Sequence, residues 1–165
     1  EYSLSPCFKI TSVAETLFVK KQTRTEALVP HSPCQALTEI REARRGLFQY
    51  YIYYVKPRTN HLHTFVSTLA TSTTTNHVQP NAITYQTIIG GPVKQYKVMY
   101  ADRQQGCFIL ATVSVSYGRG CRLLQTASTV NGQVPQDCMR VYTQYCPENS
   151  IDIYITECRT MIHTP

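Results

Sequence analysis

The residues best suited to chemistry in this sequence are its seven cysteines. They lie far apart and no two form a Cys-x-x-Cys pair, whereas structural zinc sites use closely spaced ligands. The scatter therefore predicts disulfide bonds formed in an oxidising compartment. The odd count leaves one thiol free or bridged between two chains, and spacing alone does not choose among the possible pairings. The cysteines are Cys7, Cys34, Cys107, Cys121, Cys138, Cys146 and Cys158.

The other reactive side chains do not combine into a catalytic pattern. His61 and His63 are two residues apart and would share a strand face, as metal ligands can, but no third ligand is near them in sequence. Gly118-Arg119-Gly120 lacks the helix that follows a phosphate-binding loop and is typical of a hairpin turn. No nucleophile, histidine and acid can be matched. The sequence therefore predicts a protein that is not an enzyme and holds no metal or other cofactor.

The net charge of +6 arises from 16 basic and 10 acidic residues. The cations form small groups at expected strand ends and turns, for example Lys20-Lys21 and Arg44-Arg45. A nucleic-acid binder would concentrate them in a stripe beside stacking aromatic residues, so we do not expect that partner, while an anionic small partner stays open. No run approaches the roughly 18 apolar residues of a membrane span. The start of the sequence has no signal-peptide pattern, which predicts an already processed, secreted chain.

The elements that must position these residues are mostly strands. A chain of 165 residues suits one domain, residues 1–165. Its many β-branched and aromatic residues, including 12 tyrosines, fall in short segments separated by turn signals. No helix is expected between them, which indicates an antiparallel all-β meander, and runs that are apolar on both faces favour a barrel. The expected strands cover residues 15–23, 34–42, 47–55, 63–70, 82–89, 94–101, 107–116 and 121–129.

One later segment has the periodicity of a helix. Between Val134 and Cys146 the apolar residues recur three or four positions apart. Pro135 suits the first turn of this helix, and Pro147 ends it. A short strand over residues 151–156 is expected to follow. The predicted order is therefore eight strands, one helix and one final strand.

This order resembles the tick salivary lipocalins of the histamine-binding-protein family. The resemblance covers roughly residues 17–158. It is carried by Asn81-Ala82-Ile83-Thr84-Tyr85, by Tyr100-Ala101-Asp102 leading to Cys107, and by the segment from Val134 to Cys158. It implies an eight-stranded antiparallel lipocalin barrel with a C-terminal α-helix and a short final strand. The chain has no Trp, so the tryptophan near the first strand of many lipocalins is absent.

The resemblance also implies a disulfide pairing. In this family a cysteine of the second strand usually joins the C-terminal one, which gives Cys34–Cys158. A bridge from a strand to the helix would be Cys107–Cys138, and a further bridge similar to that of the Japanin-like branch would be Cys121–Cys146. Cys7 is then unpaired, so it is either free or the link of a homodimer.

The ligand implied by the resemblance differs from that of the amine-binding relatives. Those relatives carry Cys-Asp-hydrophobic and Glu-Leu-Trp motifs, whose carboxylates pair with ammonium groups. Here the motifs are Cys107-Phe108-Ile109 and Arg122-Leu123-Leu124. A buried arginine repels an ammonium group and attracts a carboxylate. We therefore expect a small hydrophobic ligand of host origin with a carboxylate or hydroxyl, such as a leukotriene, another fatty acid or a sterol.

The expected lining of the barrel consists of alternate residues on four strands. By the resemblance, the strand face that carries Tyr51, Tyr53 and Val55 is placed inward. Two alternatives stay open: one residue of slippage would move Arg122 to the outer surface, and the side chains could simply fill the barrel. The expected ligand-binding residues are Tyr51, Tyr53, Ile83, Tyr85, Phe108, Leu110, Arg122 and Leu124.

The main interpretation is a carrier that sequesters a host mediator and so modulates inflammation or immunity. A second function class is a lipocalin that binds a host immune protein through its outer surface. A third is a biogenic-amine carrier that uses acids outside the family motif, such as Glu39 or Asp102.

Overall fold

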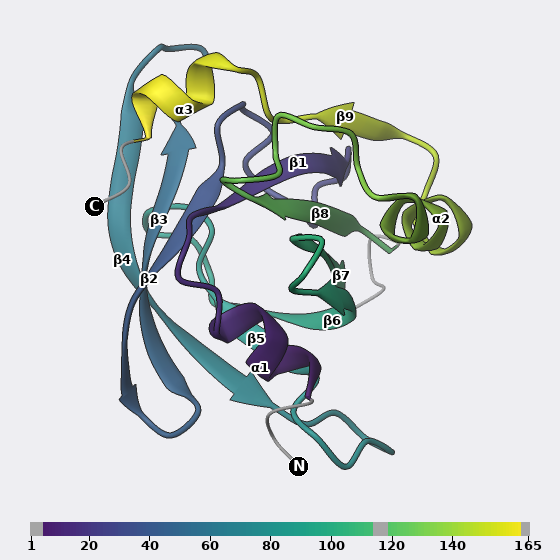
Figure 1. Ribbon diagram of the computed structural model, residues 1–165. Helices are drawn as coiled ribbons and strands as arrows, with labels where there is room; N and C mark the ends of the chain where they lie inside the picture. Colours follow the sequence, from purple (N-terminus) through teal and green to yellow (C-terminus); the bar gives the residue numbers. More distant parts are fainter. Residues whose placement is uncertain (1–4, 114–118, 163–165) are drawn as a thin grey trace.

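The computed structural model describes residues 5–113 and 119–162, which fold into an antiparallel β-barrel with a helix packed on its outside (Figure 1). The strands are β1 (Leu17–Thr23), β2 (Ala36–Arg44), β3 (Leu47–Val55), β4 (Leu62–Ser72), β5 (Ala82–Tyr85), β6 (Lys94–Asp102), β7 (Cys107–Thr112), β8 (Cys121–Thr126) and β9 (Ser150–Asp152). The helices are α1 (Pro6–Thr11), α2 (Gln136–Tyr145) and α3 (Glu157–Met161). Within the described residues, no helix has the length and apolar character that crossing a bilayer requires.

Strand β1 closes the barrel. It pairs with β8 along one edge, and along the other edge with β2 near its start and β9 near its end, always antiparallel. Strands β2 to β8 pair in chain order, so the sheet runs once around and returns to β1. A sheet closed in this way leaves few unpaired strand edges. The fold prediction is confirmed: the barrel has eight strands, with a C-terminal helix and a short extra strand.

Several strands end earlier than predicted, and hydrogen-bonded turns follow two of them. The strand expected over 82–89 stops at Tyr85, since Gln86 donates a hydrogen bond to the Gly91 carbonyl across a turn (2.7 Å). The strand expected over 121–129 stops at Thr126. There the Thr129 amide donates a hydrogen bond to the Thr126 carbonyl (2.9 Å) and closes a turn. The last strand is likewise shorter, and ends at Asp152. Residues 114–116 of an expected strand, and Gly118 of an expected turn, lie outside the described residues.

Two short helices were not predicted. In α1, the Ser5 hydroxyl accepts a hydrogen bond from the Phe8 amide (3.0 Å) and Pro6 occupies the first turn, which is a favourable helix start. Cys7 and Ile10 of this helix are buried in the apolar core of the barrel. Figure 1 shows α1 beside β5 and β6, at the end of the barrel near the N-terminus. The second unpredicted helix, α3, packs at the outer ends of β1, β2 and β3.

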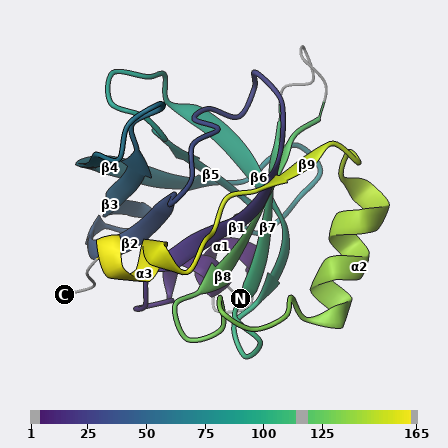
Figure 2. The same cartoon turned by 90° about the horizontal axis from the view of Figure 1, so that it is seen from above.

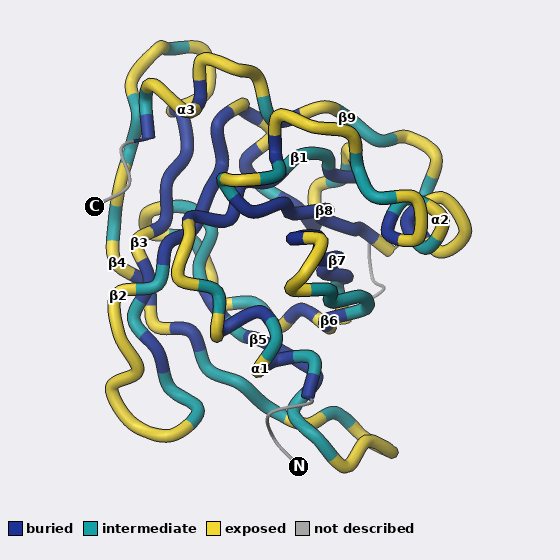
Figure 3. Tube along the Cα trace, viewed as in Figure 1, coloured by how far each residue is buried: buried dark blue, intermediate teal, exposed yellow. Residues whose placement is uncertain are grey.

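The apolar side chains form one cluster inside the barrel and two outside it. The outer cluster under α2 explains why β7 and β8 are buried on both faces: Phe108 and Leu124 point into the barrel, whereas Ile109 and Leu123 point toward α2. In Figure 3 these strands are almost entirely dark blue, and the β2–β3 hairpin is yellow mainly near its turn. Figure 2 shows α2 standing alongside the barrel wall.

Three disulfides fasten the outer elements to the barrel. The pairs are Cys34–Cys158, Cys107–Cys138 and Cys121–Cys146, the same as those implied by the resemblance. The last two join the start and the end of α2 to β7 and β8.

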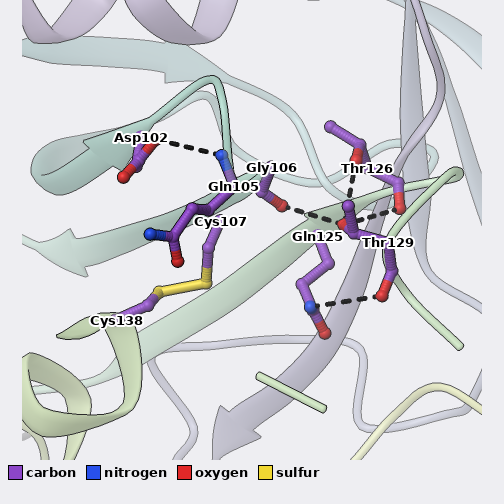
Figure 4. The surroundings of a disulfide bond; sticks show 8 residues. All are labelled: Asp102, Gln105, Gly106, Cys107, Gln125, Thr126, Thr129 and Cys138. Carbon is purple, nitrogen blue, oxygen red and sulfur yellow. Dashed lines mark hydrogen bonds between the residues drawn. A yellow bond between two sulfur atoms is a disulfide. The ribbon is translucent and has the colours of Figure 1, made fainter. Parts of the chain in front are cut away.

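Hydrogen bonds surround the Cys107–Cys138 disulfide. In Figure 4, Asp102 accepts a hydrogen bond from the Gln105 amide (3.0 Å) and the Thr129 hydroxyl donates one to the Gly106 carbonyl (3.3 Å). The turn that leads into Cys107 is therefore fixed as well. The remaining cysteine, Cys7, is free and buried.

Candidate functional site

Six of the eight expected lining residues face the interior of the barrel. Each is at most 2% exposed, and each belongs to β5, β7 or β8, where inward and outward residues alternate as the sequence predicts. They are Ile83, Tyr85, Phe108, Leu110, Arg122 and Leu124. Arg122 lies inside, over the ring of the core residue Tyr96, and not on the outer surface. Their contact with a ligand stays a prediction.

The inward orientation predicted for Tyr51, Tyr53 and Val55 is wrong. Tyr51 is 36% exposed, and Tyr53 and Val55 belong to the outer cluster beside α3. Tyr50 and Ile52 face the interior instead. The outer end of β3 is covered by the C-terminal segment, so this strand is apolar on both faces and its alternation gives no indication of direction. A shift of one residue then reverses every side chain.

Arg122 is the only charged side chain at most 2% exposed in the described residues. Its Nε donates a hydrogen bond to Gln22 Oε1 (3.1 Å), and Nη2 donates one to the Val29 carbonyl (3.1 Å). The guanidinium carbon lies 5.6 Å from the centre of the Tyr96 ring, which is a cation–π distance. Gln22 is itself held in place by donating to the Pro30 carbonyl (2.9 Å). The guanidinium is therefore held by β1 and by the loop between β1 and β2.

The pairing of this buried cation is incomplete. Arg122 Nη1 is buried and has no hydrogen-bond partner. Among residues 5–113 and 119–162, the ion pairs are Lys21–Asp152 and Arg140–Asp137, so no carboxylate neutralises Arg122. Burying a charge without a counter-charge costs roughly several kcal/mol of free energy, because the charge loses its hydration. The interior therefore contains one cation with an unused hydrogen-bond donor.

Two tyrosines stand beside this guanidinium. The rings of Tyr85 and Tyr96 are 5.3 Å apart. Burial raises the pKa of Tyr85 to about 12, although Arg122 lowers it in part. Burial also lowers the pKa of Arg122, but interactions with Tyr96 and Tyr85 raise it, and the net direction is upward. At neutral pH the site thus combines a permanent cation with the protonated phenol of Tyr85, and a phenol hydroxyl can donate a hydrogen bond to an anion or a hydroxyl.

Sequence reasoning missed several residues of this site. Tyr96 lies on a predicted strand, and its alternation with Val98 could have placed it inside. Gln22 and Val29 gave no such indication, because their contacts with Arg122 join positions about a hundred residues apart in the chain.

The acids considered for an amine site are already engaged. Glu39 is half-buried and accepts a hydrogen bond from the Tyr50 hydroxyl (3.1 Å). Burial raises the pKa of Glu39, Tyr50 lowers it, and Glu42 raises it, with a net upward shift. Asp102 accepts the Gln105 amide in the turn before β7. Neither carboxylate contacts Arg122 or the tyrosines beside it.

The two histidines considered as metal ligands have different surroundings. His61 is exposed in the turn before β4, and the His63 ring packs against Tyr54 with 5.4 Å between the ring centres. In the part of the chain that the structure describes, no three or more His, Cys, Asp or Glu side chains are grouped as a metal site requires.

Comparison with known proteins places the whole barrel in a family. A family model described as tick histamine binding protein matches residues 9–160. A search of the curated proteins found no match.

The solved structures give matches of low sequence identity. Japanin from Rhipicephalus appendiculatus bound to cholesterol is 14% identical, with a TM-score of 0.63 over 88% of this chain and 95% of Japanin. The AM182 serotonin complex is 12% identical, with a TM-score of 0.64 over 92% and 91%. The cockroach allergen Per a 4 is 12% identical, with a TM-score of 0.58 over 92% and 90%. At these identities the likeness shows the fold alone.

Proposed function

This chain belongs to the tick histamine-binding protein family, and on that basis we propose that it is a secreted lipocalin that sequesters a small hydrophobic host mediator in its barrel. The ligand is an apolar molecule with a carboxylate or hydroxyl, such as a leukotriene, another fatty acid or a sterol. The protein performs no reaction on it and acts by lowering its free concentration. Removal of the mediator in turn reduces host inflammation or alters host immunity.

The incomplete pairing of Arg122 carries this proposal. A carboxylate beside Nη1 would supply both the missing counter-charge and the missing acceptor. The hydroxyls of Tyr85 and Tyr96, which interact with Arg122, are further polar groups at this site, and they suit the hydroxyl of a neutral ligand. Phe108 and Leu110 provide apolar walls for the remainder of the molecule.

The same arrangement disfavours an amine at this position. The solved relatives show that this fold accommodates cholesterol in Japanin and serotonin in AM182. In this chain the guanidinium of Arg122 would repel an ammonium group. An amine would need an acid outside the family motif, and both acids considered are engaged: Glu39 accepts the Tyr50 hydroxyl, and Asp102 accepts the Gln105 amide.

The test combines native mass spectrometry of the secreted protein with calorimetric titration of arachidonate, cholesterol and histamine. We expect a lipid to be retained or arachidonate to bind, with affinity falling about tenfold or more in Arg122→Gln because a charge-assisted hydrogen bond is lost. Arg122→Lys should keep part of the affinity, and cholesterol should be little affected. Arg140→Gln, which removes an exposed arginine of α2, is the matched control.

Three results would overturn the proposal. Tight histamine binding would show that the barrel selects amines. Equal arachidonate affinity in Arg122→Gln and Arg140→Gln would remove Arg122 from the site. A protein that retains no lipid and binds none of the three probes would favour the host-protein partner.

A further inference from the structure

A groove lies outside the barrel, between α2 and the outer face of β6 and β7. Its volume is about 470 Å³, within the range of small-molecule sites. Met99 and Ala111 contribute apolar surface from the strands, and Val141 and Tyr145 contribute it from α2. Tyr145 is 54% exposed, so its ring offers contact area that no other part of the described chain covers. This groove shares none of the Arg122 site.

The groove has a positive rim. His77, Lys97 and Arg119 line it, and none of the described residues that line it is acidic. All three are exposed, and none takes part in an ion pair within residues 5–113 and 119–162. Basic side chains around an apolar floor attract an anion with an apolar tail.

Covalent bonds fix the position of α2, which forms one wall of the groove. The disulfides Cys107–Cys138 and Cys121–Cys146 fix the two ends of α2 to β7 and β8. On the opposite wall, the register of β6 shifts between Val98 and Tyr100, which is the position of Met99. Ala111 lines the groove with a single methyl group, so its side chain occupies little of the groove volume. A preformed groove of this kind loses little conformational entropy when a ligand binds.

We propose that this groove is a second ligand site, which takes a small amphiphile with one anionic head and a single apolar chain. The head lies among the basic side chains at the rim, and Lys97 and Arg119 are its main electrostatic partners. The chain lies along Met99, Val141 and Tyr145. The site is independent of the barrel interior and of the mediator proposed to bind there.

The test is a titration with dodecanoate followed by methyl NMR, which locates the ligand. The methyl groups of Ala111 and Val141 report on the groove, whereas those of Leu110 and Leu124 report on the barrel. We expect the groove signals to shift saturably with dodecanoate and not with dodecyltrimethylammonium. The double variant Lys97→Glu/Arg119→Glu should weaken this binding by about tenfold or more, because two charges that attract the head are replaced by two that repel it.

The matched control is Arg44→Glu/Lys56→Glu, which makes the same change in net charge at exposed positions on β2 and in the β3–β4 turn. It should alter the groove affinity less than about twofold. Equal effects of the two double variants would overturn the proposal, because attraction would then be due to net charge alone.

Two further outcomes also decide. Shifts confined to Leu110 and Leu124 would support the barrel site and overturn the groove. Groove shifts caused by a short Asp- and Leu-containing peptide, with none caused by dodecanoate, would overturn the small amphiphile in favour of a peptide.

Discussion

At the scale of single residues, Arg122 differs from the surrounding barrel core. Two of its nitrogens are bonded to Gln22 and to the loop before β2, and the third is left without a partner. If Arg122 binds a ligand, its buried charge lowers the stability of the ligand-free protein. If it serves the fold, removing it must loosen the barrel. The two roles are separated by stability measurements.

The variant Arg122→Met tests this difference. We expect its free energy of unfolding to stay within about 1 kcal/mol of the parent or to rise, since replacing an unneutralised buried charge by an apolar chain is often neutral or stabilising. The Val29 carbonyl still accepts the Thr87 hydroxyl (2.6 Å), whereas Gln22 Oε1 loses the Arg122 donor and the Tyr96 ring loses its cation. Urea denaturation with the disulfides intact measures it. A loss above about 3 kcal/mol would indicate a structural role for Arg122.

The raised pKa of Tyr85 gives a prediction at alkaline pH. An unfolded tyrosine has a pKa of about 10, and burial raises that of folded Tyr85 to about 12. Between these values the folded chain holds a proton that the unfolded chain has released, so stability falls as pH rises, by up to about 3 kcal/mol. Tyr85→Phe should remove this part of the decline, as measured by urea midpoints from pH 9 upward. An unchanged slope in Tyr85→Phe would contradict the assignment.

At the scale of elements, the disulfides supply stability that other proteins obtain from a larger apolar core. Cys34–Cys158 spans 124 residues, and Cys121–Cys146 spans 25. The longer bridge restricts the unfolded chain more, so it should stabilise the fold more, by about 5 kcal/mol against about 3–4 kcal/mol. Guanidinium denaturation of Cys34→Ala/Cys158→Ala and Cys121→Ala/Cys146→Ala compares them. The reverse order would indicate that the α2 bridge preserves contacts beyond chain entropy.

Helix α1 determines the state of Cys7. The thiol donates to the Ala82 carbonyl (3.3 Å), is 1% exposed, and has its pKa raised to about 12 by burial. Because thiolate is the reactive form, Cys7 should react with iodoacetamide at pH 8 at least tenfold more slowly in the folded protein than in urea. A disulfide-linked homodimer through Cys7 requires α1 to leave the barrel. Rapid labelling under native conditions would show that it does so readily.

At the scale of the whole molecule, a closed barrel carries a net charge of +6 with its cations on the surface and one inside. The surface charge acts on a ligand before contact, and Arg122 acts after entry. For arachidonate, the association rate should therefore fall several-fold between about 0.02 and 0.5 M salt, while the dissociation rate stays nearly constant. Stopped-flow fluorescence resolves the two rates. Cholesterol is uncharged and is the control, and an equal salt effect on it would contradict steering by charge.

Much of the fold follows from local patterns in the sequence. The hairpin turns, the period of two on β5 and β7, and the start of α2 at Pro135 are properties of neighbouring residues, so they can be predicted without contacts. The same alternation placed Tyr85 and Leu110 inside. The loss of the acidic motif residue at Arg122 was also evident from the sequence, and with it the expectation of an anionic or neutral ligand.

Other features depended on which surfaces come together. The direction of β3 could not be predicted, because Tyr53 is buried on the outside by a segment more than a hundred residues later in the chain. The state of Arg122 depended on Gln22 and on the loop before β2, again distant in sequence. The sequence by itself determined the order of the main strands, helix α2 and the charge of the site, since these follow from local patterns. Only the tertiary structure decided which faces are inside and that Arg122 Nη1 lacks a partner, because burial and hydrogen bonding are set by distant parts of the chain.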